Sequence, residues 1–143
     1  MDNYLKLSVK SDCINEHLSR QVIATFMTSL DPTLEEICDV KTAVSEAVTN
    51  AIVHGYENLT GTVNLTAEIN GKELYIEVED YGRGIADVER AREPLYTSQP
   101  EKERSGMGFT VMEAFMDYVD VISRPGLGTK VIMKKLIGVA HEM

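Results

Sequence analysis

Two residues one helical turn apart, Glu46 and Asn50, are the first candidates for chemistry in this sequence. Residues four apart on an α-helix lie above one another on one face. The carboxamide oxygen of Asn50 is a neutral, hard ligand that suits Mg²⁺, and the carboxylate of Glu46 could accept a proton from an attacking hydroxyl. Such a pair is also common on a solvated helix rim, so it predicts a site only together with other features of the chain.

A second candidate group is Asp80-x-Gly82-x-Gly84, which directly follows a strand-like segment. A carboxylate at the end of a strand only accepts hydrogen bonds and suits an exocyclic amine such as N6 of adenine. The two glycines allow a sharp turn and let the backbone approach a flat ring or a ribose closely. By itself, this pattern is more typical of an ordinary turn at the end of a strand.

A third candidate group is Gly106-x-Gly108 at a predicted helix start, where unpaired backbone N–H groups and the helix dipole favour phosphate. Arg104 lies just upstream and could donate two hydrogen bonds to a terminal phosphate, although a solvated loop position is an equal alternative. The order and spacing of the three groups together predict a nucleotide site. The sequence contains no Walker A, protein-kinase or Rossmann motif, so this site would be of another kind.

The elements that must position these groups follow from the hydrophobic pattern. A helix that begins near Pro32 carries Glu46 and Asn50, and a second helix spans residues 14–30. The first of these has a predicted buried face of Ile37, Val40, Val44, Ala47, Val48 and Ala51. The second has a predicted buried face of Ile14, Leu18, Val22, Phe26 and Leu30.

Five segments have the pattern of strands and one further segment that of a short helix. The strands are expected at residues 4–10, 62–69, 73–79, 118–123 and 129–136, and the helix at residues 109–116. Asn70-Gly71 is the expected two-residue hairpin turn. Residues 86–105 show no sustained period, which predicts a functional flap or disorder. The pattern predicts an α+β two-layer sandwich in one domain, residues 1–143, with helices on one face of a mixed, mostly antiparallel sheet.

Composition restricts the class of protein. The 143 residues have a net charge of −9 without a basic cluster, which argues against direct binding of nucleic acid. No apolar run is long enough to span a bilayer and the first residues lack the features of a signal peptide, so we expect a cytoplasmic protein without a membrane contact. Cys13 and Cys38 have no metal-like spacing and are expected to be buried, reduced thiols.

The chain resembles the GHKL (Bergerat-fold) ATPases over nearly its whole length. Glu46-x-x-x-Asn50, the Asp80–Ile85 turn and the Gly106–Phe109 turn match the N, G1 and G2 boxes of that superfamily. Residues 45–56, 94–97 and 103–109 are most similar to the anti-sigma-F factors of endospore-forming bacteria, a family of small serine protein kinases.

This resemblance implies roles for individual residues. Asn50 would coordinate Mg²⁺, Glu46 would be the catalytic base, Arg104 would lie near the γ-phosphate, and residues 86–105 would form the lid. The residues implied to contact ATP or ADP are Asn50, Asp80, Gly82, Gly84, Ile85, Thr97, Ser105, Gly106, Met107, Gly108, Phe109 and Thr129.

The resemblance also implies partners. A homodimer would hold one sporulation sigma factor of RNA polymerase through the helix that carries Glu16 and Arg20, and would release it when an anti-anti-sigma protein displaces it. The kinase would then phosphorylate a serine of that protein. An exposed ion pair of little energetic value is the alternative for Glu16 and Arg20.

Two other functions stay open at this point. One is a nucleotide-gated anti-sigma or docking module with negligible kinase activity. The other is the catalytic half of a histidine kinase, or an ATPase of the gyrase or Hsp90 type. We expect neither a phosphoacceptor helix pair ahead of this domain nor a transducer domain behind it, which disfavours the second alternative.

Overall fold

The computed structural model describes residues 1–93 and 108–138. Its five strands are β1 (Asn3–Lys10), β2 (Thr62–Asn70), β3 (Glu73–Asp80), β4 (Tyr118–Arg124) and β5 (Gly128–Leu136). Its α-helices are α1 (Ile14–Phe26), α2 (Leu34–Thr49), α3 (Val88–Ala91) and α4 (Gly108–Phe115). A 3-10 turn, η1 (Met27–Leu30), continues α1, and a π-helical segment, η2 (Asn50–Gly55), continues α2.

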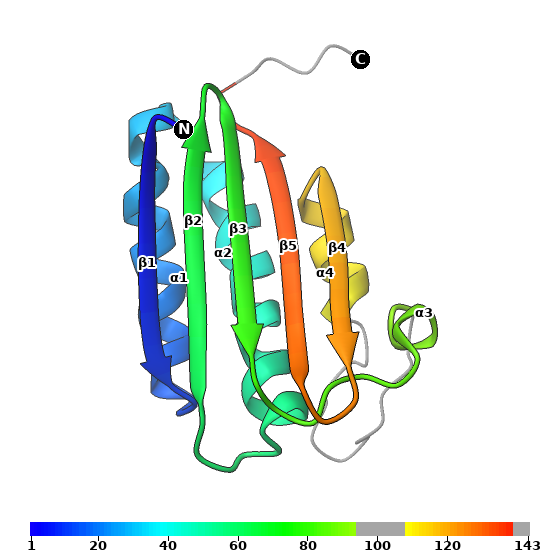
Figure 1. Cartoon of the computed structure of the whole chain (residues 1–143). Coiled ribbons are helices and arrows are strands. Elements are labelled where there is room, and N and C mark those ends of the chain that lie inside the picture. Colours follow the sequence, from blue (N-terminus) through cyan, green and yellow to red (C-terminus); the bar gives the residue numbers. More distant parts are fainter. Residues whose placement is uncertain (94–107, 139–143) are drawn as a thin grey trace.

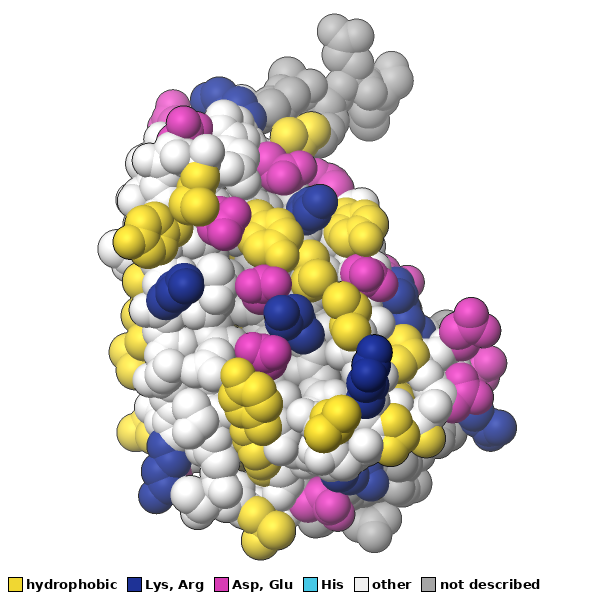
Figure 2. All heavy atoms as spheres, viewed as in Figure 1, with side chains coloured by type: hydrophobic (Ala, Val, Ile, Leu, Met, Phe, Trp, Pro, Cys, Tyr) yellow, Lys and Arg dark blue, Asp and Glu magenta, His cyan; other side chains and the backbone are white. Residues whose placement is uncertain are grey.

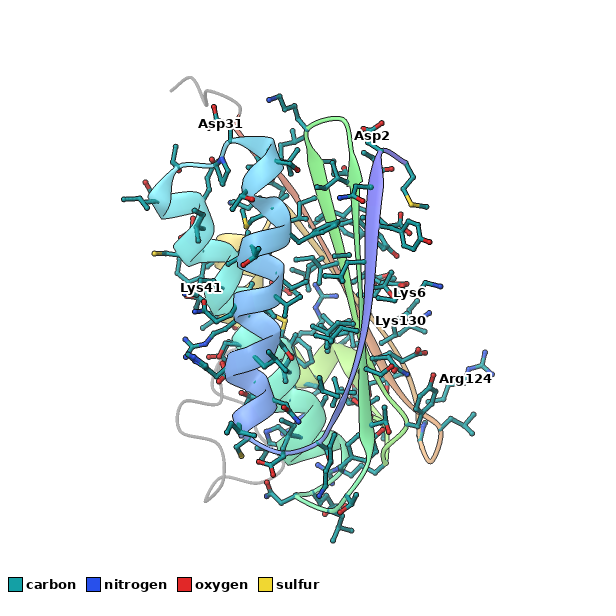
Figure 3. All side chains as sticks on the ribbon, turned by 90° about the vertical axis from the view of Figure 1, so that its left-hand side faces the viewer. Asp2, Lys6, Asp31, Lys41, Arg124 and Lys130 are labelled. Atoms are coloured by element: carbon teal, nitrogen blue, oxygen red, sulfur yellow. The ribbon has the colours of Figure 1, made fainter. Side chains whose placement is uncertain are left out.

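The strands form one antiparallel sheet in the order β1-β2-β3-β5-β4, and α1, α2 and α4 cover one of its faces (Figure 1). Seen from the side, Lys6 and Lys130 point away from the helices, from the other face of the sheet (Figure 3). That open face mixes hydrophobic, basic and acidic side chains (Figure 2). The predicted two-layer α+β sandwich is confirmed, and every pair of neighbouring strands in this described sheet is antiparallel.

The core lies between the sheet and the helices. Burial alternates along β2 and β3, so that one side of each strand faces the helices and the other faces solvent. From α2, the residues buried against the sheet include Val40, Val44, Ala47 and Val48, with Ile37 partly buried beside them. The predicted buried face of this helix is confirmed.

The start of α2 is fixed by a capping box. The Thr33 hydroxyl accepts a hydrogen bond from the backbone N–H of Glu36 (3.1 Å), and the Glu36 carboxylate accepts one from the backbone N–H of Thr33 (2.9 Å). From this fixed start, α2 and η2 form one continuous helix that ends at Gly55. The wider π-helical turns begin at Asn50.

The predicted buried face of α1 is wrong at its N-terminal end. Ile14 is 73% exposed and Leu18 is 45% exposed, whereas Ile23 and Met27 are fully buried. The predicted residues are spaced by four, and a helix turns by about 400° over four residues, so such a row drifts around the axis by about 40° at each step. Leu30 is therefore in the core while Ile14, four steps earlier, faces solvent.

Several smaller expectations also need correction. Asn70 pairs with Glu73 in the β2–β3 ladder, so the turn consists of Gly71 and Lys72, and Gly71 has the positive φ of 63°. Both cysteines are free, as predicted, but exposed rather than buried. The segment predicted to be irregular begins with the short helix α3, whose N-cap is Asp87. In the described part of the chain, no helix combines the length and the apolar character needed to cross a bilayer.

Candidate functional site

A cavity of about 340 Å³ lies where β3 ends and β5 begins, between η2 and the start of α4. This volume is in the range of small-molecule sites. Of the residues predicted for the site, those lining the cavity are Asn50, Asp80, Gly84, Ile85, Gly108, Phe109 and Thr129. The walls between them are completed by apolar residues from the sheet and helices, among them Ala47, Val78 and Val131.

One end of the cavity brings Glu46, Asn50 and Gly108 together. A Cβ atom on Gly108 would lie 3.1 Å from Nδ2 and 3.2 Å from Oδ1 of Asn50, and 3.4 Å from Oε2 of Glu46. Gly108 is the first residue of α4, where backbone N–H groups are unpaired by the helix. Two oxygen-bearing side chains therefore lie against a helix N-terminus, an arrangement that can bind phosphate and a hard cation.

The side-chain oxygens at this end of the cavity fit Mg²⁺ only if a bound substrate and water supply further ligands. In residues 1–93 and 108–138, no group of three or more His, Cys, Asp or Glu side chains could hold a metal ion. Asn50 and Glu46 offer hard oxygen atoms, and Mg²⁺ is commonly bound by one or two protein oxygens together with substrate phosphates and water. The residues present are therefore suited to a metal that arrives with a nucleotide.

Asp80, at the end of β3, also lines the cavity and is only 5% exposed. Its carboxylate accepts hydrogen bonds from the backbone N–H groups of Gly82 (2.9 Å) and Thr129. Burial raises the pKa of this carboxyl from 3.8 to about 6, while the two backbone hydrogen bonds act in the opposite direction. At neutral pH the group is ionised and accepts hydrogen bonds only, as needed to bind an amino group.

The raised pKa of Asp80 predicts a pH-dependent stability of the nucleotide-free protein. Below about pH 4 the carboxyl of Asp80 is protonated in both the folded and the unfolded chain, and the folded state bears no buried charge. As the pH rises from about 4 through about 6, the folded state loses stability relative to the unfolded state, because it holds the proton more tightly. Relative to the wild type, Asp80→Asn should therefore gain stability across this window, by roughly 3 kcal/mol at most. Urea unfolding of both proteins at pH 4, 5, 6 and 7 measures the difference. A difference that stays constant with pH would show that burial does not perturb Asp80.

Glycines place the Asp80–Ile85 turn between η2 and the β4–β5 hairpin. A Cβ atom on Gly82 would lie 2.0 Å from the backbone oxygen of Gly55, which also accepts a hydrogen bond from the N–H of Arg83 (2.9 Å). Gly84 has a φ of 74°, and a Cβ atom there would lie 2.0 Å from the backbone oxygen of Arg124. Both glycines are needed because two backbones come too close for any side chain.

We expect Gly84→Ala to lower the free energy of unfolding by about 3 kcal/mol, because it combines a left-handed conformation with a clash against backbone. For a domain of this size the midpoint of thermal unfolding should fall by about 10 °C. Gly71→Ala is the matched control: Gly71 also has positive φ, but nothing lies within 4 Å of an added Cβ, so about 1 kcal/mol is expected. Equal losses in the two variants would contradict the clash at Gly84.

Glu16 and Arg20 are not residues that line the cavity. They form an ion pair along α1, with Nε of Arg20 3.5 Å from Oε1 of Glu16, and Arg20 also contacts Nδ1 of His17 at 2.8 Å. Glu16 in addition accepts a hydrogen bond from the hydroxyl of Ser45, the residue before Glu46. The pair is thus partly buried and linked to α2, rather than a simple exposed ion pair.

Thr97, Arg104, Ser105, Gly106 and Met107 lie outside the described residues, as does the predicted lid beyond residue 93. Of the remaining predicted residues, Glu46 and Gly82 are not among those that line the cavity. Glu46 lies 3.4 Å from the position of a Cβ on Gly108, and Gly82 lies against Gly55.

Two residues with a clear structural part in the site were missed in the sequence. A Cβ on Gly55 would lie 2.7 Å from the carboxylate of Asp80, so any other residue there would displace that carboxylate. A helix-end glycine is a recognisable pattern, but its contact with a residue 25 positions later is not. Ser123 on β4 hydrogen-bonds Ile85 and residues at the start of β5, and no local pattern distinguishes it from any other strand serine.

Comparison with known proteins gives consistent matches. The model of the histidine kinase-like ATPase domain matches residues 9–135. Proteins named anti-sigma F factor are similar over almost their full length: that of Clostridium acetobutylicum is 58% identical (99% of each chain covered), and that of Clostridium kluyveri is 56% identical (94% of this chain, 95% of the other).

Solved structures share the fold at low sequence identity. The RsbU and RsbW domains of Rv1364c from Mycobacterium tuberculosis match with a TM-score of 0.69 and 19% identity, over 94% of this chain and 32% of that one. The catalytic domain of the histidine kinase ThkA matches with a TM-score of 0.59 and 13% identity, over 94% and 96% of the two chains.

Proposed function

Because the chain belongs to the anti-sigma F factors, within the histidine kinase-like ATPase family, we propose that it binds a sigma factor of RNA polymerase and acts as an ATP-dependent protein kinase. The proposed sigma factor is one of sporulation, and the proposed substrate is a serine of the cognate anti-anti-sigma protein. The proposed place of action is the cytoplasm.

The observation that carries this proposal is the division of one cavity into two chemically different parts. Asp80, a buried acceptor, suits the amino group of adenine, whereas Asn50 and the N-terminus of α4 suit phosphates and Mg²⁺. The apolar walls between them suit a flat base and a ribose. An adenine nucleotide carries the groups that suit each of these features.

The proposed reaction assigns one chemical task to Glu46. The serine hydroxyl attacks the γ-phosphorus, the bond from that phosphorus to the bridging oxygen of ADP breaks, and Glu46 accepts the hydroxyl proton. Asn50 would hold Mg²⁺, which neutralises charge on the phosphates when it is bound. Arg104, two residues before Gly106 in the sequence, would donate hydrogen bonds to the γ-phosphate.

The experiment that tests the kinase proposal uses labelled ATP, the purified chain and an anti-anti-sigma protein. Label that appears on serine, and not on a protein in which the acceptor serine is Ala, is the expected result. Tight binding of ATP without any transfer would instead favour the nucleotide-gated docking module.

The proposed homodimer is tested separately by light scattering, which should give twice the chain mass of 15.9 kDa.

For the sigma factor, α1 is the proposed contact surface. The helix exposes Ile14 and Leu18 on its first two turns, beside the partly exposed ion pair of Glu16 and Arg20. Exposed apolar residues next to an arginine are typical of protein interfaces, where a few such residues carry most of the binding energy.

Arg20→Glu should weaken sigma binding at least tenfold, because it reverses the charge beside the exposed Ile14 and Leu18 of this surface, while ATP binding stays unchanged. Lys72→Glu in the β2–β3 turn is the matched charge reversal away from α1, and should leave sigma binding intact. The affinity of each variant for surface-immobilised sigma factor is measured in the presence of ATP. Equal weakening by both substitutions would indicate a general charge effect and exclude α1 as the contact.

A further inference from the structure

A single hydroxyl, that of Ser123 on β4, joins three segments next to Asp80. Its Oγ accepts a hydrogen bond from the backbone N–H of Ile85 (2.7 Å). The same atom lies 3.0 Å from the backbone oxygen of Gly128, to which it donates, and 2.8 Å from Oγ1 of Thr129. Ser123 thus connects the end of the glycine-rich turn with the first two residues of β5.

The number of protons decides how these hydrogen bonds are arranged. A serine hydroxyl has one proton and two lone pairs. If Ser123 donates to Gly128, its two lone pairs accept from Ile85 and from the hydroxyl of Thr129, and all three hydrogen bonds form. If Ser123 donates to Thr129 instead, the backbone oxygen of Gly128 loses this donor. The first arrangement makes one more hydrogen bond and is therefore favoured.

This arrangement determines what Thr129 can offer to a ligand. Its hydroxyl proton is directed to Ser123 and its backbone N–H to the carboxylate of Asp80, so its side chain can only accept hydrogen bonds from the cavity. Asp80 beside it is also an acceptor. Thr129 is only 9% exposed and lines the cavity, so water competes little for this position.

We infer that Ser123 is a positioning residue for base selection: by holding the proton of Thr129, it makes this part of the cavity accept an amino group and disfavour an oxo group. The inference rests on the proposed binding of a purine nucleotide. Part of the discrimination between 6-amino and 6-oxo purines is thereby assigned to a strand residue that is not among those lining the cavity.

The test compares the affinities of the full chain for ATP and for inosine triphosphate, which carries an oxo group in place of the amino group. Titration calorimetry gives the ratio of the two dissociation constants for each variant. Ser123→Ala frees the Thr129 proton to donate to an oxo group, so the preference for ATP should fall about tenfold, the equivalent of one neutral hydrogen bond. Ser123→Thr keeps a hydroxyl on a strand that tolerates β-branched residues and should keep the preference.

A second substitution shows whether Ser123 acts through Thr129. Thr129→Val removes the hydroxyl with little change in shape and should itself reduce the preference. In that background, Ser123→Ala should have no further effect on the ratio, even if it weakens both nucleotides. Because Thr129→Val tests the same proton, the inference remains testable if Ser123→Ala does not fold.

The outcomes separate this inference from the proposed function. Equal weakening of both nucleotides by Ser123→Ala, with an unchanged ratio, would overturn the role in base selection and leave a structural one. A wild-type chain that binds neither nucleotide would instead overturn the proposed function, and this inference with it.

Discussion

Replacing Glu46 by Gln is expected to lower the rate of phosphoryl transfer by about 10²–10⁴-fold, while the affinity for ATP changes by less than about threefold. The substitution removes the group that accepts the proton of the serine hydroxyl but keeps the size of the side chain. The position of Glu46 explains why transfer and binding are affected differently. Its Oε2 atom lies 3.4 Å from the position of a Cβ on Gly108, near the proposed phosphate site, so it can act on the reaction. Glu46 is not among the residues that line the cavity, so its substitution should change ATP binding little.

The measurement is single-turnover transfer to the anti-anti-sigma protein, alongside calorimetric binding of ATP. Glu35→Gln is the matched control, because it makes the same chemical change on the exposed first turn of α2. Normal transfer in the Glu46 variant would exclude a role as base. Loss of binding together with transfer would show that Glu46 acts on nucleotide affinity instead.

Asp80→Asn is expected to reduce the affinity for ATP by about 50-fold, because a charged acceptor is lost and the single oxygen of the amide must serve two backbone N–H donors as well as the amino group of the base. In the wild type, these donors are the backbone N–H groups of Gly82 and Thr129, which donate to the carboxylate. The same variant should be relatively more stable without nucleotide above about pH 6, because the wild type must bury a charge there.

Glu79→Gln tests whether the effect belongs to the cavity. Glu79 precedes Asp80 on the same strand but points to the open face, where its carboxylate lies 3.9 Å from Nζ of Lys130. It should bind ATP as the wild type does. Unchanged affinity in the Asp80 variant would mean that the base is bound elsewhere, and would remove the main support for the two-part cavity.

The parts of the site that the sequence predicts are those whose residues lie close together in the sequence. Glu46 and Asn50 share a helix, and a helix has a fixed repeat, so their proximity follows from their spacing. Asp80, Gly82 and Gly84 follow one another in a single turn. The meeting of Glu46 and Asn50 with Gly108, by contrast, involves residues about 60 positions apart and depends on how α2 packs against α4.

Periodicity was less reliable for the orientation of an element than for its type. The row from Ile14 to Leu30 correctly indicates a helix, but the row drifts around the axis and only the packing of α1 selects Ile23 and Met27 for the core. Likewise, Asn70-Gly71 correctly indicates a hairpin, and pairing of Asn70 with Glu73 moves the turn by one residue.

By itself, the sequence determined the types of elements, the helix that carries Glu46 and Asn50, and the family of the chain, because these depend on composition, repeat and motif within short segments. Only the tertiary structure decided that Gly55 must leave room for Asp80 and that Ser123 holds the hydroxyl of Thr129. Such contacts join separate strands and helices, and their existence depends on distances that no local spacing contains.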